Sequence, residues 1–185
     1  LVDYNKREKK YYFNYNIKDS IGKIHSFYGN YGILVRAYTY MSVLGKEGLK
    51  NIALLAVLNA NYLKKILSKK FDIPYSKSTL HEFVISAVKQ KNRGLKALDI
   101  GKSLLDYGFH APTVYFPINI PESMMIEPTE TESKETLDAF AEALFEIDEK
   151  IDSNLDYLLN TPYLTPVRRL NETLANRELD VRYEK

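Results

Sequence analysis

Two short apolar runs, each ended by proline and polar or acidic residues, are the strongest constraint on how this chain folds. They are Thr113–Ile118 and Met124–Ile126. Runs of this length with such boundaries are typical of short β-strands joined by loops. Polar side chains at strand ends are often directed into a cleft, although a plain strand–loop–strand connection explains the pattern equally well. The polar residues carried onto these loops are His110, Thr113, Glu127, Thr129 and Glu130.

Helical spacing of apolar residues predicts two helices in the first part of the chain. One extends from about residue 27 to residue 44, and a second from about 49 to 68, with glycines marking the turn between them. The second helix is apolar nearly all round, so we expect it to be buried on several sides or covered by another surface. Its asparagines, Asn59 and Asn61, then need hydrogen-bond partners.

The remaining elements follow from similar patterns. The aromatic-rich stretch 9–16 is typical of a strand or extended arm. Residues 80–88 form a β-branched and apolar run suited to a central strand, with His81 near its start and the polar stretch 89–94 ending it. Residues 95–107 have the periodicity of an amphipathic helix.

A long helix is expected after the second short strand. Thr129 or Thr131 would cap it, and Glu132 would complete a capping box. Together these elements predict an α+β fold, a small antiparallel sheet with helices on one face. The expected division is an N-terminal strand or arm at 1–24, a helical junction segment at 25–70, an α+β small domain at 71–160 and a C-terminal arm at 161–185.

Composition excludes several classes of function. The 185 residues include no cysteine, which rules out disulfides and thiol chemistry. The three histidines lie far apart in the sequence and predict no metal site. Basic and aromatic residues mix at 9–16 without any nucleic-acid-binding motif, so no nucleic-acid partner is expected. Neither a signal peptide nor an apolar stretch long enough to cross a membrane is present, which predicts a cytoplasmic protein without membrane association.

Several motifs, in order along the chain, resemble one enzyme family. They include S-I-G-K-I-H-S-F-Y-G-N-Y-G-I-L at 20–34, L-D-I-G-K-S-L-L-D-Y-G-F-H at 98–110, H-A-P-T at 110–113, M-I-E-P-T-E-T-E at 125–132 and T-P-V-R-R-L-N-E at 165–172. These motifs are similar to those in the C-terminal part of the glycine cleavage system P-protein, the decarboxylating glycine dehydrogenase. The form in which the enzyme is split into two chains is the most similar, and the match is to its second subunit.

The resemblance implies the small C-terminal domain of a fold-type-I pyridoxal-phosphate enzyme. In that family, glycine is decarboxylated with pyridoxal phosphate, and the aminomethyl group passes to lipoamide on the H-protein. The implied partners are therefore the lipoylated H-protein and the first P-protein subunit, or the remainder of the same enzyme. Self-association through exposed apolar surface is a further expectation.

The resemblance also implies which residues contact substrate. His110 and Thr113 on the H-A-P-T loop are the first candidates, and Glu127, Thr129 and Glu130 are the second. Weaker candidates are His81, Asn59 and Asn61. Helix-end charge and ordinary loop hydrogen bonding remain open alternatives for these side chains.

The family's cofactor lysine lies in a histidine–lysine motif, and this sequence has no His-Lys dipeptide. We therefore expect the 185-residue chain to be inert by itself and not to bind pyridoxal phosphate. Two other classes remain open. The first is the small domain of another fold-type-I enzyme, such as an aminotransferase, with Arg36, Arg168 or Arg169 binding a carboxylate. The second is a non-catalytic helical interaction module.

Overall fold

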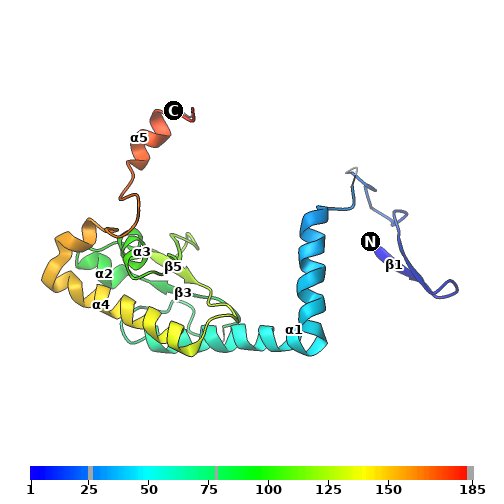
Figure 1. Cartoon of the computed structure of the whole chain (residues 1–185), viewed down its shortest axis with the longest axis horizontal. Helices are drawn as coiled ribbons and strands as arrows, with labels where there is room; N and C mark the ends of the chain where they lie inside the picture. Colours follow the sequence, from blue (N-terminus) through cyan, green and yellow to red (C-terminus); the bar gives the residue numbers. More distant parts are fainter. Residues whose placement is uncertain (25–26, 78, 183–185) are drawn as a thin grey trace. The chain divides into compact units, whose positions relative to one another are not determined.

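The computed structural model of the chain describes residues 1–24, 27–77 and 79–182 (Figure 1). The chain divides into two compact units, Leu1–Leu49 and Lys50–Lys185. Each is described by itself. The four-part division expected from the sequence stays a prediction.

The first unit begins with a β-hairpin. Strand β1 (Val2–Asn5) pairs antiparallel with β2 (Lys10–Phe13), with Val2 opposite Phe13. The turn is closed by the Asn5 side chain, which accepts hydrogen bonds from the backbone N–H groups of Arg7 and Glu8 at 3.0 and 3.2 Å. A strand within 9–16 is thus confirmed.

Helix α1 (Tyr31–Leu67) runs from the first unit into the second. Asn30 begins it, because its side-chain oxygen accepts the Ile33 N–H at 3.2 Å. Gly45 interrupts the helical geometry with φ 63° and ψ −176°, a left-handed conformation that glycine tolerates. The predicted break between two helices is therefore confirmed at Gly45, whereas Gly48 lies inside the helix.

The second unit is built on a three-stranded antiparallel sheet of β3 (Phe83–Ser86), β4 (Thr113–Val114) and β5 (Ser123–Ile126), in the order β3-β5-β4. The observed fold is α+β with antiparallel sheets, as predicted. The expectation that 80–88 forms the central strand is wrong, because β5 lies between the other two. The first short apolar run keeps only two residues in β4, since Tyr115 adopts a left-handed backbone with φ 59°.

Side chains alternate across this sheet as the strand period requires. Phe83, Ile85, Met124 and Ile126 point into the core that the sheet shares with the helices. Met125 points to the opposite face and lines a shallow hollow with loop residues such as Tyr75 and Phe116. The helices are α2 (Val88–Asn92), α3 (Ala97–Asp106), α4 (Lys134–Leu159) and α5 (Glu172–Arg177).

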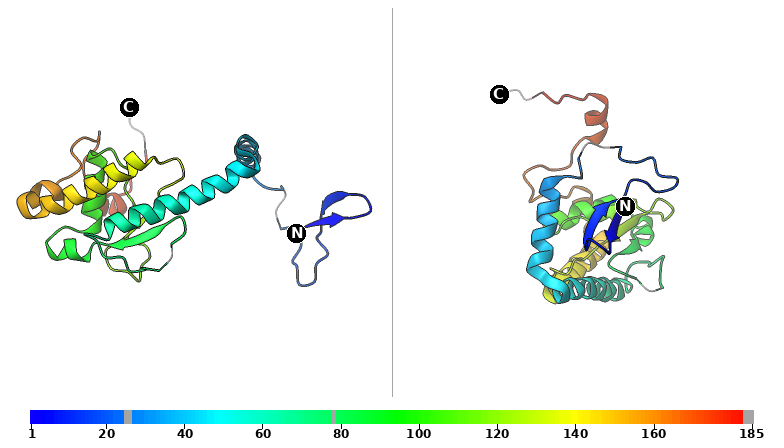
Figure 2. Two further views of the ribbon diagram at one scale, coloured as in Figure 1. Left: turned by 90° about the horizontal axis from the view of Figure 1, so that it is seen from below. Right: turned by 90° about the vertical axis from the view of Figure 1, so that its right-hand side faces the viewer.

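Helices α3 and α4 pack on each other, and both contribute to the core next to the sheet (Figures 1 and 2). The helix predicted at 95–107 is confirmed as α3. The polar stretch 89–94 was expected only to end a strand, but most of it belongs to α2. Helix α2 is too short for its apolar spacing to be recognised in the sequence. Its Gln90 is buried and donates a hydrogen bond to Asp148 of α4 at 2.8 Å.

The start of α4 also differs from the prediction. Neither Thr129 nor Thr131 caps it. Ser133 does, and its hydroxyl accepts the Thr136 N–H at 3.2 Å. Helix α4 carries an apolar stripe that faces the core, and its buried members include Leu137, Phe140, Ala141, Leu144, Ile147 and Ile151.

The second half of α1 is not covered on all sides by its own unit. Ala60, Leu63 and Leu67 are buried, but Leu54 and Leu58 are 58% and 62% exposed. Burial on several sides is therefore not observed within this unit, and the other alternative, that a further surface covers the helix, stays a prediction. Among the described residues, no helix is long and apolar enough to span a lipid bilayer.

Candidate functional site

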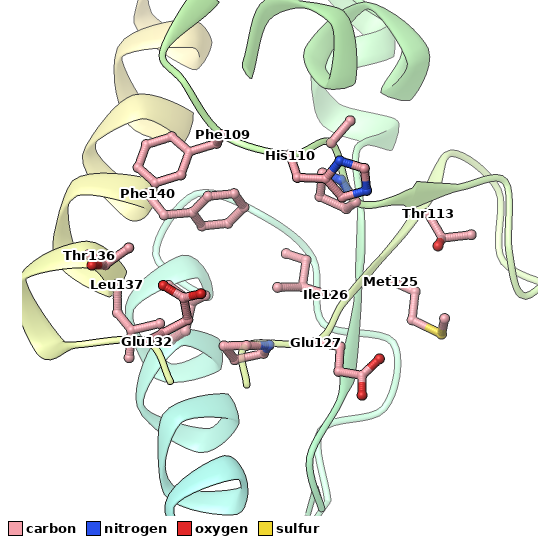
Figure 3. Close-up of a pocket in the computed structure, with 14 residues that line it drawn as sticks. Phe109, His110, Thr113, Met125, Ile126, Glu127, Glu132, Thr136, Leu137 and Phe140 are labelled. Atoms are coloured by element: carbon pink, nitrogen blue, oxygen red, sulfur yellow. The ribbon is translucent and has the colours of Figure 1, made fainter. Parts of the chain in front are cut away.

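A pocket of about 380 Å³ lies in the second unit, between the loop that follows α3, the end of β5 and the first turns of α4 (Figure 3). Its walls come from four parts of the chain that are distant in sequence. The residues that line it are Leu63, Phe109, His110, Ala111, Pro112, Thr113, Met125, Ile126, Glu127, Pro128, Glu132, Thr136, Leu137 and Phe140.

The end of α3 determines how the His110 loop enters the pocket. Gly108 takes a left-handed conformation (φ 80°), and its N–H donates to the Leu105 carbonyl at 3.1 Å. The Phe109 N–H donates to the Leu104 carbonyl, also at 3.1 Å. This pair of bonds is the Schellman motif. It turns the chain so that Phe109 packs on the core while the exposed His110 follows at the pocket rim.

The apolar wall is made of packed aromatic and aliphatic side chains. The rings of Phe109 and Phe140 meet edge to face, with centroids 5.3 Å apart and planes at 85°. This geometry is favoured by the ring quadrupoles. Leu63 of α1 and Ile126 of β5 complete the surface. These residues favour an uncharged, partly apolar ligand segment.

Three of the five main predicted site residues lie together at this pocket: His110, Thr113 and Glu127. Thr113 is the first residue of β4 and pairs with Met125 of β5. Glu127 follows directly after β5. The structure brings these three side chains to one pocket, and their role in binding stays a prediction.

Thr129 and Glu130 are not among the lining residues. The Thr129 carbonyl accepts a hydrogen bond from the Asn59 amide at 2.9 Å, and its hydroxyl lies 2.7 Å from that of Thr131. Through both contacts Thr129 helps to fix the loop that connects β5 to α4. The sequence signal of a polar T-E-T-E run could not separate residues that line the pocket from those that shape the loop.

The weaker candidates occupy three different places. His81 Nε2 lies 3.8 Å from Glu127 Oε1, and both side chains are about half exposed, at 52% and 54%. Asn59 reaches the β5–α4 loop. Asn61 lies outside the pocket and donates to the carbonyls of Val57 and Thr79, at 2.8 and 2.9 Å. Both asparagines thus find the hydrogen-bond partners that the sequence required.

Sequence reasoning missed two polar residues of the pocket, Glu132 and Thr136. Glu132 had been interpreted as part of a helix cap. The available signal was spacing, because Thr136 and Phe140 are four apart and lie on one face of α4. In Figure 3 the Glu132 side chain lies on the α4 side of the pocket, and Glu127 lies on the side of the strands.

The polar groups of the pocket define what it can do. Glu127 and Glu132 supply carboxylates and His110 an imidazole, so the pocket can accept or donate hydrogen bonds and exchange protons. None of the lining residues is lysine or arginine within the part of the chain that the structure describes. The pocket therefore does not fit the phosphate of a cofactor, nor a Schiff base to the protein.

Two of the three arginines that an aminotransferase could use to bind a carboxylate, Arg168 and Arg169, are engaged elsewhere. Arg169 lies 2.7 Å from Asp99, and Arg168 stacks over the ring of Tyr163 at 4.1 Å. Neither lines the pocket. Among the residues described, no cluster of three or more His, Asp or Glu side chains could hold a metal ion.

Comparison with known proteins indicates the same family as the sequence motifs. The family model described as "Glycine dehydrogenase, C-terminal domain" matches residues 52–161, which include the whole pocket. Three similar proteins are named "Probable glycine dehydrogenase (decarboxylating) subunit 2". That of Chloroherpeton thalassium is 50% identical over 173 residues, 94% of this chain and 35% of the relative. That of Chlorobium phaeobacteroides is 51% identical over 172 residues, 92% of this chain and 35% of the relative.

A Bacillus cereus relative of the same name is 48% identical over 180 residues, 97% of this chain and 37% of the relative. The chain thus spans little more than a third of the length of these curated relatives. Among solved structures, a similar one is the crystal structure of glycine decarboxylase (P-protein) of the glycine cleavage system in inhibitor-bound form. It is 26% identical with a TM-score of 0.51, and the match covers 58% of this chain and 24% of that one.

Proposed function

Because the chain belongs to the glycine dehydrogenase C-terminal domain family, we propose that it is the C-terminal part of the second subunit of a decarboxylating glycine dehydrogenase. The whole enzyme decarboxylates glycine with pyridoxal phosphate, which supplies the electron sink, and passes the aminomethyl group to lipoamide on the H-protein. Residues 71–160 then form the small domain of a fold-type-I enzyme. The cofactor is held by parts of the enzyme other than the pocket described above.

The pocket is the part of this chain that serves the reaction. Its apolar wall and its two carboxylates, Glu127 and Glu132, suit an uncharged chain better than the carboxylate of glycine, which they would repel. We therefore place the lipoyl arm of the H-protein along Phe109, Phe140 and Leu63. His110 and Thr113 at the rim are then its hydrogen-bonding partners, with Glu127 beside them.

The observation that carries this proposal is the meeting of three motif residues at one pocket. His110 and Thr113 come from H-A-P-T, and Glu127 from M-I-E-P-T-E-T-E. Thr129 acts indirectly, through its contacts with Asn59 and Thr131 in the loop that carries Glu127, and a substrate contact of Glu130 stays a prediction. Partners of the chain are the first subunit and the H-protein, and a second apolar surface on α1 supports self-association or contact with the rest of the enzyme.

The test uses the complete second subunit assembled with the first subunit and the lipoylated H-protein. The variant His110→Ala should lower the exchange of the glycine carboxyl group with labelled bicarbonate by about a hundredfold, the usual scale for a lost proton-transfer or hydrogen-bonding group. Its melting temperature should change little, since His110 is exposed.

Lys89→Ala is the matched control, because Lys89 is an exposed residue that pairs with Asp72 at 2.6 Å and does not line the pocket. Its exchange rate should equal that of the unmodified enzyme. A His110→Ala rate within about threefold of this control would mean that His110 is structural, and the site assignment would fail.

A further inference from the structure

The loop between β5 and α4, residues 127–133, carries pocket residues at both ends. Glu127 and Pro128 follow the strand, and Glu132 precedes the helix cap. The strand end is held by the pairing of Ile126 with Phe83. The helix end is held by the Ser133 cap. The positions of the Glu127 and Glu132 carboxylates therefore depend on the contacts that fix the loop between these two points.

Asn59 of α1 contacts the loop at two points between its ends. Its side-chain Nδ2 donates to the Thr129 carbonyl at 2.9 Å and to the Glu132 carbonyl at 3.2 Å. An amide nitrogen has two N–H groups, so both can be used at once. The Thr129 carbonyl also accepts the Glu132 N–H at 3.3 Å. One side chain therefore holds both sides of a turn.

Asn59 lies on the face of α1 that forms part of the pocket. The next residue, Ala60, is fully buried, and Leu63, one turn beyond Asn59, lines the pocket. Asn59 itself is half-buried. Helix α1 thus contributes a leucine to the wall of the pocket and an asparagine to the loop that closes it.

We propose that Asn59 is a positioning residue for this pocket, which sets the place of Glu127 and Glu132 relative to His110. The inference deepens the proposed function and rests on it. Asn59 itself does not line the pocket. It acts through the loop, by holding two carbonyls that would otherwise turn toward water.

Two neighbouring contacts separate this role from a general structural one. Asn61, two residues later, is also half-buried, and its amide also donates to two carbonyls, those of Val57 and Thr79. Neither of those residues lines the pocket. The Tyr62 hydroxyl bonds Asp138 of α4, so α1 keeps a hydrogen bond to α4 when the Asn59 amide is removed.

The first experiment measures amide hydrogen exchange in the 185-residue chain. The variants are Asn59→Ala, Asn59→Asp, which keeps the shape but removes the donor, and the control Asn61→Ala. Both Asn59 variants should speed exchange of the Glu132 amide, whose N–H donates to the Thr129 carbonyl that Asn59 also holds, by about tenfold. Asn61→Ala should leave this amide unchanged and act near Thr79. Equal exchange of the Glu132 amide in Asn59→Ala and Asn61→Ala would overturn the proposal.

The second experiment measures glycine carboxyl exchange in the complete enzyme with the same variants. Asn59→Ala should lower kcat/KM about tenfold more than Asn61→Ala at a similar loss of melting temperature, which a purely structural role would not do. Equal rates would overturn the proposal even if the loop loosens. If the unmodified enzyme does not decarboxylate glycine, the proposed function fails, while the exchange of the Glu132 amide still decides whether Asn59 holds the loop.

Discussion

The guanidinium of Arg169 lies 2.7 Å from the carboxylate of Asp99, whose side chain is only 9% exposed. Arg169 also donates to the carbonyl of Thr161 at 2.6 Å and to that of Leu158 at 3.3 Å. Asp99 in turn accepts the N–H of Lys96 at the start of α3, at 3.1 Å. One arginine from the T-P-V-R-R-L-N-E segment therefore joins the start of α3 to the end of α4.

Replacing this arginine should destabilise the fold. Arg169→Ala leaves the Asp99 carboxylate buried without its cation and frees two carbonyls at the end of α4. We expect a loss of about 2 to 3 kcal/mol in the free energy of unfolding, less than for a fully buried pair because Arg169 is about a third exposed. Urea denaturation followed by circular dichroism measures it.

Arg182→Ala provides the control, since Arg182 makes a similar pair with Asp180 at 3.2 Å but is 78% exposed. That change should leave the urea midpoint where it is. Similar urea midpoints for the two variants would show that the contact of Arg169 with Asp99 does not stabilise the fold in solution.

Glu122 gives the stability of the chain a dependence on acid. Its side chain is 6% exposed, lies 2.7 Å from Lys91 and accepts the Ala97 N–H at 2.9 Å. Burial raises the pKa of Glu122, but the hydrogen bonds from Lys91 and Ala97 outweigh it, so the pKa lies below its ordinary value of 4.5. The folded chain therefore holds this proton less strongly than the unfolded chain.

It follows that the contribution of Glu122 is complete above pH 4.5 and is lost as the pH falls through its lower folded pKa. Glu122→Gln should lower the free energy of unfolding by about 1 kcal/mol at pH 7, and the difference should shrink at pH 3. Urea midpoints at the two pH values measure this. Glu149→Gln, at a site 69% exposed, should show no such difference. A gap for Glu122→Gln that stays constant from pH 7 to pH 3 would contradict the assignment.

The sequence predicted the presence of most elements but not how they pair. Thr113–Ile118 and Met124–Ile126 were recognised as strands from local composition, yet which strand is central depends on contacts between distant residues. Phe83 pairs with Ile126, and no local feature of the sequence indicates this pairing. The start of α4 shows the same limit. Asn59, 70 residues away in the sequence, donates a hydrogen bond to the Thr129 carbonyl. Thr129 is thereby part of a loop, and α4 begins only after Ser133.

The site was predicted where local rules apply. Thr113 and Glu127 lie at strand ends, and His110 lies in the loop that leads into β4, so the strand pattern marks these positions in the sequence. Leu63 was missed, because an all-apolar helix gives no indication of which face meets a pocket. Glu132 was interpreted as a cap residue, since a carboxylate near a helix start suits both roles. Only the position of the cap at Ser133 separates them.

The exposed apolar face of α1 predicts self-association. Leu54 and Leu58 are one turn apart and are 58% and 62% exposed, and contiguous apolar surface of this kind drives pairing. Leu58→Glu should therefore shift the 185-residue chain toward monomer in sedimentation velocity runs over a range of concentrations.

The control Leu164→Glu alters a leucine that is 78% exposed in the C-terminal tail and should leave the distribution unchanged. Charge placed at Leu58 acts only if that face is buried between copies, because a solvated glutamate costs a lone helix little. The unmodified chain remaining monomeric at every concentration would contradict the prediction. The α1 face would then be left for the rest of the enzyme to cover.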